Sequence, residues 1–221
     1  MIKVENIETW GFEHAIRGMR NPMNSWDKSD SYPEVSGYTV GDNDLRLMRS
    51  LYKASLTGNH AHRKYLRQIF VSMDITAPLY WWKEFDTYKV GTVANSCSTM
   101  HKIHDKVFTI DDFSHEHLDG ELSITKYHEL QISGWDTLSL MIQVLNGYRQ
   151  KYLETHDKKW WWQMIQLLPT SYNQKRTVTM NYENAIVIIL QRTAHKLDEW
   201  RKFVDILSLQ LPYLDEITKE E

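Results

Sequence analysis

The residues best suited to bind a charged ligand lie close together in the sequence, within residues 80–102. This stretch reads YWWKEFDTYKVGTVANSCSTMHK. Two tryptophans and a Lys-Glu pair precede a polar segment that contains Asn95, Ser96, Ser98 and the only cysteine, Cys97. Asn and Ser side chains, together with backbone N–H groups before a helix start, can bind a phosphate. The segment NSCSTMHK could equally start a helix with Asn95 or Ser96 as its cap, and the two roles can coexist.

Two cations could serve the same phosphate. Lys89 follows the aromatic segment, and Arg192 ends the apolar segment AIVIILQR. Either side chain can neutralise a phosphate, but only arginine offers a planar pair of parallel donors. The alternatives are a solvated helix end for Lys89 and a helix-end cap or an exposed position for Arg192.

Composition limits the class of protein. The chain has 221 residues, of which 42% are hydrophobic and 25% charged, as in ordinary soluble domains. A formal net charge of -3 argues against an extended basic surface that binds nucleic acid, but it allows a local anion pocket. A single cysteine favours a reducing compartment, and the sequence shows neither a signal peptide nor an apolar run long enough to span a bilayer. We therefore expect a cytoplasmic protein that binds neither nucleic acid nor membrane.

The elements that must position these residues form one expected domain over residues 1–221, because no repeat or linker divides the chain. Residues 21–44 are polar and rich in turn formers, which predicts a long surface loop. Apolar spacing and capping residues predict helices over 42–59, 77–89, 135–154 and 158–168, and two helices or one bent helix over 183–212. Asp42 or Asp44 is the expected cap of the first of these helices. Residues 68–76 and 175–182 have the pattern of strands. The expected class is α+β, with a small antiparallel sheet and several long helices.

The aromatic content is high, with nine tryptophans and twelve tyrosines. Most should pack in the core or between subunits. Trp81 and Trp82 could also stack on a flavin or a base. Three consecutive tryptophans, 160–162, point around a helix, so they cannot all be core, and at least one should contact a subunit or a ligand.

Three local patterns together resemble the flavin-dependent thymidylate synthases. FVSMDITAPLYWWKEFDTYKVGTVANSCSTMHK has the layout of that family's strand ending in Ala-Pro, its helix and its signature R-H-R-x-x-S-x-N-x-x-S-x-R-Y. WWQMIQLLPTSYNQKRTVTMNYENAIVIILQR is similar to the family's helix ending in Leu-Pro, short strand, Asn and apolar helix ending near an arginine. AHKLDEWRKF is similar to the ending A-Q-x-E-I-R. The resemblance covers roughly residues 57–212.

The departures from the family pattern concern mainly its cations. Thr87-Tyr88-Lys89 stands where R-H-R is expected, and the family arginine before Leu-Pro falls at Ile165. The upstream motif H-x-S-x-F-E-H retains only His62, and a family Gln falls at Glu84. The resemblance therefore implies a divergent member that lacks much of the usual set of phosphate-binding arginines.

The resemblance implies that a reduced flavin delivers a hydride to a pyrimidine deoxynucleotide, dUMP or a related one, that carries a one-carbon unit. It implies FAD as cofactor, methylenetetrahydrofolate and NADPH as further candidates, and a homotetramer with pockets shared between subunits. The residues that it assigns to the nucleotide are Glu84, Lys89, Asn95, Ser98 and Arg192. Those that it assigns to the cofactor are His62, Tyr88, Lys89 and Asn181. No residue is assigned a catalytic role, and no metal ligand is assigned.

Three alternatives stay open. Glu84 only accepts hydrogen bonds when ionised, which suits the amine of cytosine better than a uracil carbonyl, but it could instead pair with Lys83 or a neighbouring subunit. The chain could be a non-catalytic descendant that binds a nucleotide or a protein partner without flavin. The histidine pairs in HAH, HKIH and HEH would suit a metal-dependent hydrolase, although no HExxH or cysteine pair completes such a site.

Overall fold

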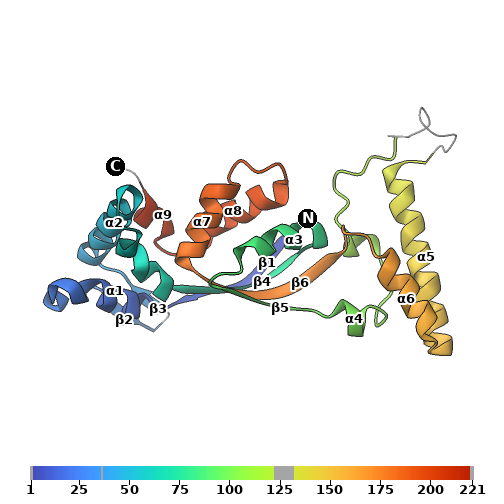
Figure 1. The fold of residues 1–221 in the computed structure, drawn as a ribbon, viewed down its shortest axis with the longest axis horizontal. Coiled ribbons are helices and arrows are strands. Elements are labelled where there is room, and N and C mark those ends of the chain that lie inside the picture. Colours follow the sequence, from blue (N-terminus) through green and yellow to red (C-terminus); the bar gives the residue numbers. More distant parts are fainter. Residues whose placement is uncertain (1, 36, 122–131, 220–221) are drawn as a thin grey trace. The chain divides into compact units, whose positions relative to one another are not determined.

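The computed structural model describes residues 2–35, 37–121 and 132–219 (Figure 1). The chain forms two compact units. The first unit consists of Met1–Lys3, Thr76–Asp86 and Ser96–Arg176, and the second of Val4–Ile75, Thr87–Asn95 and Thr177–Glu221. That the two units form a single domain stays a prediction.

A four-stranded sheet supplies strands to both units. Its order is β1 (Lys3–Trp10), β4 (Phe70–Pro78), β6 (Asn173–Asn181) and β5 (Thr92–Ser96). In β4 the side chains of Val71, Met73 and Ile75 are buried while the residues between them are partly exposed, which is the alternation that the sequence predicts. The predicted class, α+β with a small antiparallel sheet and several long helices, is confirmed. Strands β1 and β5 were not expected, and β5 occupies part of the predicted polar loop.

The second unit holds most of the helices. They are α1 (Phe12–Arg20), α2 (Asp42–Thr57), the 3-10 helix η3 (His60–Gln68), α7 (Tyr182–Arg192), α8 (Asp198–Gln210) and α9 (Leu214–Thr218). Helix α2 packs against η3 and α9, and α7 packs against α8 and η3. Gly58 ends α2 as predicted. The range 183–212, predicted to form two helices or one bent helix, holds two helices, α7 and α8, and the short α9 lies beyond it.

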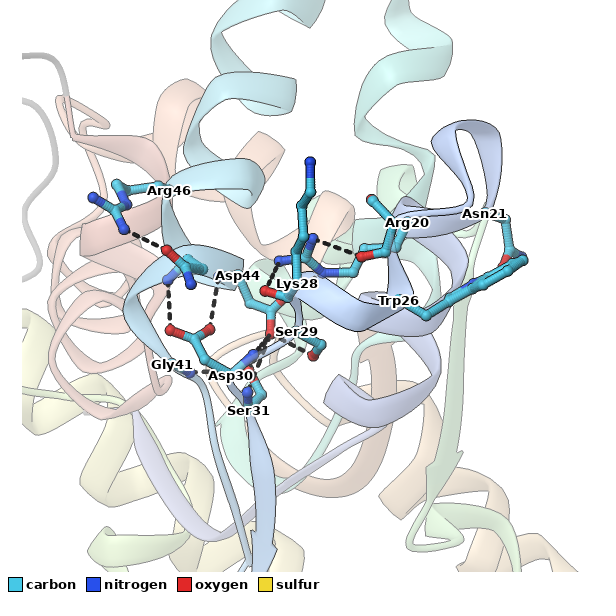
Figure 2. Close-up of polar contacts among 12 residues, drawn as sticks. Arg20, Asn21, Trp26, Lys28, Ser29, Asp30, Ser31, Gly41, Asp44 and Arg46 are labelled. Atoms are coloured by element: carbon cyan, nitrogen blue, oxygen red, sulfur yellow. Dashed lines mark hydrogen bonds and ion pairs between the residues drawn. The ribbon is translucent and has the colours of Figure 1, made fainter.

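The predicted surface loop 21–44 contains ordered elements. Two short 3-10 helices, η1 (Asn21–Met23) and η2 (Trp26–Lys28), precede a hairpin in which β2 (Tyr32–Glu34) pairs antiparallel with β3 (Gly37–Thr39). The side chains of Asp30 and Asp44 hold this segment (Figure 2).

Asp42 or Asp44 was expected to cap α2, but the N-cap is Gly41, and the buried carboxylate of Asp44 binds the preceding segment. It accepts hydrogen bonds from Arg20 Nε at 2.5 Å and from the hydroxyls of Ser29 and Ser31, each at 2.7 Å (Figure 2). Burial alone would raise the pKa of Asp44, but the hydrogen bonds from Ser31, Ser29 and Arg20 outweigh burial and hold the pKa below its ordinary value.

The first unit is built around a helical hairpin. Helices α5 (Gly134–Thr155) and α6 (Lys158–Leu167) pack together, and their core includes Leu138, Leu145 and Met164. Helix α6 ends just before Pro169, as predicted. The remaining helices of this unit are α3 (Leu79–Phe85), α4 (Thr99–Lys102) and the 3-10 helix η5 (Ile110–Asp112); a further 3-10 turn, η4 (Asp86–Tyr88), follows α3.

The tryptophans divide into buried and exposed members. Trp81 and Trp82 are 0% and 1% exposed and pack with Phe85, so the expectation that they could stack on a ligand is wrong. Both rings are buried in the core and present no exposed surface to a ligand. In the run 160–162, Trp162 is 45% exposed, which confirms that the three are not all core. Contact of this run with a subunit or a ligand stays a prediction.

Within the ranges that the structure describes, no helix is both long and apolar enough to cross a membrane.

Candidate functional site

The second unit joins two of the predicted site residues, Tyr88 and Arg192, directly. Tyr88 is buried, and its hydroxyl accepts a hydrogen bond from Arg192 Nε at 2.8 Å while it donates one to Gln191 Oε1 at 3.0 Å. The Arg192 guanidinium carbon lies 4.6 Å from the ring centre of Trp200, which is fully buried on α8. The guanidinium is thereby held in one orientation by a hydrogen bond and by a cation–π contact.

Helix α7 explains why Arg192 reaches this position. Ala185, Ile186 and Ile188 bury one face of the helix, and α8, which follows closely in the chain, packs against it. Arg192 lies in the last turn, where a cation is favoured by the helix dipole. The helix-end position expected as an alternative for Arg192 is therefore real, and it coexists with the contact to Tyr88.

The start of α7 fixes the turn that carries Lys89. Asn181 is buried and caps the helix, because its Oδ1 accepts from the backbone N–H of Asn184 at 3.0 Å. The side chain of Asn184 in turn donates to the carbonyl of Val90 at 2.7 Å. Gly91 follows with φ of 82°, and a Cβ there would lie 2.7 Å from Asn184 Oδ1. Asn181, predicted to bind the cofactor, thus has a structural role in this helix.

Lys89 and Asn95 are exposed, the first on this turn and the second on β5. Neither makes a hydrogen bond or an ion pair with Tyr88 or Arg192 among the residues that the structure describes. The solvated position expected as an alternative for Lys89 agrees with its exposure, and ligand contacts of both residues stay predictions.

His62 lies on the wall of a cavity of about 600 Å³ in the second unit. The cavity is formed by α1, α2 and η3, and its polar lining includes Asn59, Lys64 and Gln68. Its volume falls in the range of small-molecule sites. His62, the residue that resembles the upstream family motif, therefore lies at a cavity of small-molecule size.

Two arginines that sequence reasoning missed attach η3 to α7. Glu183 accepts from Arg63 Nε at 2.9 Å and from Arg67 Nε at 2.5 Å. Burial would raise the pKa of Glu183, but Arg67 and Arg63 outweigh it and lower the pKa. The i,i+4 spacing of the two arginines in HRKYLRQ was the available signal, but their partner lies more than a hundred residues later in the chain.

The remaining predicted residues lie in the first unit. Ser98 caps α4, because its hydroxyl oxygen accepts from the backbone N–H of His101 at 3.1 Å. A helix does start in this segment, but the expected caps were wrong: Asn95 and Ser96 lie on β5, and Ser98 is the cap. Glu84 is half-buried on α3. Cys97 is exposed and lies just beyond the last residue of the edge strand β5, although a lone cysteine is usually buried.

For metal binding, the described part of the chain contains no group of three or more His, Cys, Asp or Glu side chains that could hold an ion.

Comparison with known proteins gives a clear result for the fold. No protein-family model matches the sequence, and no curated protein matches it. Among solved structures, thymidylate synthase X (ThyX) from Helicobacter pylori with FAD and dUMP has a TM-score of 0.66 at 14% identity, over 98% of this chain and 96% of that chain. A UMP/dUMP methylase, PolB from Streptomyces cacaoi, bound with 5-Br dUMP, has a TM-score of 0.67 at 15% identity, over 98% and 94%.

These matches define the class of fold: the chain has the fold of the flavin-dependent thymidylate synthases. A second structure of the Helicobacter pylori enzyme, also complexed with FAD and dUMP, agrees with a TM-score of 0.65 at 14% identity, over 97% of this chain and 96% of that chain. The likeness extends over nearly the whole length of each protein, although few residues are identical.

Proposed function

We propose that the chain is a divergent flavin-dependent thymidylate synthase-like enzyme that transfers a one-carbon unit and a hydride to a pyrimidine deoxynucleotide, dUMP or a related one. The observation that carries this proposal is the likeness of fold over 98% of the chain to structures that contain FAD and dUMP. The oriented Arg192 supports it, because a guanidinium fixed at a helix end suits a phosphate monoester.

The residues of the second unit have distinct parts in this proposal. Arg192 binds the nucleotide phosphate, and Tyr88 orients its guanidinium through the bond at 2.8 Å. His62 and the cavity lining around it hold part of FAD, whose bound ring supplies the hydride chemistry. The donors Asn59, Lys64 and Gln68 fit such a ligand, because a flavin has several carbonyl and ring-nitrogen acceptors. The roles proposed for Lys89, Asn95 and Asn181 at the nucleotide or cofactor rest on the family resemblance.

In the first unit, Glu84 and Ser98 are proposed contacts of the nucleotide on the same resemblance. The remaining parts of the proposal rest on the sequence alone. They are a homotetramer, a single domain, the use of methylenetetrahydrofolate and NADPH, and a cytoplasmic location.

The test is a search for bound flavin followed by ligand stabilisation. The purified protein should be yellow, with a flavin absorbance band, and FAD and dUMP should each raise its melting temperature. UMP should be assayed beside dUMP, because a protein of the same fold is described as a UMP/dUMP methylase. A colourless protein that FAD does not stabilise would contradict the proposed enzyme and favour the non-catalytic descendant.

A further inference from the structure

Arg176 in the first unit lies over an aromatic ring. Its guanidinium carbon lies 4.3 Å from the ring centre of Trp82, and its side chain is only 17% exposed. Trp82 is itself fixed, because it is 1% exposed and its Nε1 donates to the carbonyl of Gln174 at 2.9 Å. Because the ring is fixed, its cation–π contact restricts the position of the guanidinium.

A chain of hydrogen bonds also sets the rotation of this guanidinium within its plane. Arg176 Nε donates to Gln174 Oε1 at 3.0 Å. The other side of the same amide, Gln174 Nε2, donates to the carbonyl of Cys97 at 2.9 Å. Cys97 is anchored in turn, since its backbone N–H donates to the carbonyl of Lys175 at 2.9 Å. Gln174 is buried, so its amide has little freedom to move.

The charge of Arg176 is weakly compensated. Asp86 is the carboxylate that faces it, with Oδ1 3.4 Å from Nη1, and this carboxylate is 45% exposed. Exposed ion pairs of this kind contribute little. Burial lowers the pKa of Arg176, and the attraction of Asp86 opposes that shift only in part. Nη2 makes no hydrogen bond or ion pair with any residue in the described ranges, so one edge of an oriented guanidinium is available.

We propose that Arg176 is an oxyanion-binding residue whose Nη1 and Nη2 edge takes a phosphate monoester. A phosphate would accept from both nitrogens and displace Asp86, whose exposed carboxylate can turn into solvent. Asp86 therefore acts as an internal competitor for the site. The proposed function assigns the phosphate of the pyrimidine nucleotide to Arg192, so the site at Arg176 is a separate oxyanion site that does not rest on that assignment.

The competing explanation is a structural one, in which the Asp86–Arg176 pair and the contact with Trp82 serve only to stabilise the first unit. The two explanations predict different effects on phosphate affinity when Asp86 is neutralised. If Asp86 competes with a ligand, its neutralisation tightens phosphate binding. If the pair is only structural, neutralisation leaves phosphate binding unchanged.

The experiment measures the affinity of the full chain for inorganic phosphate, dUMP and deoxyuridine by calorimetry at constant ionic strength. Arg176→Gln should weaken binding of inorganic phosphate by roughly ten- to hundredfold, as expected for loss of hydrogen bonds from a charged donor, and leave deoxyuridine binding unchanged. Arg176→Lys should give a smaller loss, because it keeps the charge but not the paired donors. Asp86→Asn should tighten phosphate binding by about two- to fivefold.

A matched control is Arg149→Gln, also in the first unit, because Arg149 is occupied by the carbonyls of His104 and Asp105. It should leave phosphate affinity unchanged. Unchanged phosphate binding in both Arg176→Gln and Asp86→Asn, or no phosphate binding by the parent protein, overturns the inference. Should Arg176→Gln fail to fold, Asp86→Asn decides alone. Phosphate binding that depends on Arg176 without any binding of dUMP supports the inference and contradicts the proposed function.

Discussion

Arg192 Nε donates to the hydroxyl of Tyr88 at 2.8 Å, and this bond joins two residues that are 104 positions apart in the sequence. Tyr88 occupies the middle position of the segment aligned with the R-H-R signature. The structure gives it a buried hydroxyl that accepts a hydrogen bond from Arg192, and its contact with the cofactor stays a prediction. We therefore interpret Tyr88 as a positioning residue for Arg192.

Replacement of Tyr88 by Phe should weaken nucleotide binding selectively. The ring is kept, but Arg192 loses the acceptor of its Nε, so its guanidinium becomes less well oriented. We expect the Kd for dUMP to rise by about tenfold, which corresponds to about 1.4 kcal/mol, while that for deoxyuridine stays the same. Calorimetric titrations with the two ligands measure this difference.

The matched control is Tyr182→Phe. Tyr182 is also buried, and its hydroxyl donates to the carbonyl of Pro212 at 3.0 Å, so this variant loses a comparable hydrogen bond at the other end of α7. Both variants should lose about 1 kcal/mol of stability. Equal losses of dUMP affinity in the two would show that Tyr88 has only a structural role.

The sequence predicted the elements with strong patterns and missed those defined by distant partners. Alternation in 68–76 and helical spacing in 135–154 were sufficient, because burial on one face leaves a periodic signal. Strand β5 has an exposed side and a polar sequence, and its state depends on pairing with β6. Hairpin β2–β3 depends on the buried Asp44, whose partners include Arg20, 24 positions earlier. Local pattern contains no information on such pairings.

The candidate site shows the same limit. Arg192 was predicted from its place at the end of an apolar helix, and the structure confirms that place. Arg176 lies on strand β6, and the sequence pattern of this strand does not mark it as a site residue. It becomes a candidate through its contact with Trp82, which is 94 positions earlier in the chain. The sequence identified Trp82 as aromatic but could not show that its ring would be buried beneath a guanidinium.

Stability at low pH should depend on Asp44. Its pKa is lowered in the folded state, so its contribution is present above the unfolded pKa of about 3.9 and is lost as pH falls through the folded value. Asp44→Asn leaves the buried Arg20 without its charged partner and should cost about 3 kcal/mol at pH 7. Urea unfolding between pH 7 and pH 2 should show a parent–variant difference that shrinks toward acid.

The control for this prediction is Asp42→Asn, two residues earlier on α2, where the side chain is exposed. It should change the free energy of unfolding by about 0.5 kcal/mol. A parent–variant difference for Asp44→Asn that is independent of pH would contradict the assignment of a lowered pKa.

Two glycine-to-alanine substitutions should change the stability of the protein in opposite directions. Gly91 has φ of 82° and no room for a Cβ, so Gly91→Ala should destabilise the protein by more than about 1 kcal/mol and displace the turn that carries Lys89. Gly147 lies within α5, where nothing lies within 4 Å of an added Cβ, so Gly147→Ala should stabilise by about 0.5–1 kcal/mol. Thermal and urea unfolding measure both, and the same sign for the two would contradict the model of the turn.

Glu84 should influence which base is accepted. An ionised Glu only accepts hydrogen bonds, which favours the exocyclic amine of cytosine, whereas Gln can also donate to a uracil carbonyl. We expect the parent protein to be stabilised more by dCMP than by dUMP, and Glu84→Gln to shift this preference toward dUMP by about tenfold in relative affinity. Lys83→Gln is the control for the neighbouring charge and should leave the preference unchanged. Stronger protection of the parent protein by dUMP would count against a cytosine substrate, and an unaltered preference in Glu84→Gln would place Glu84 away from the base.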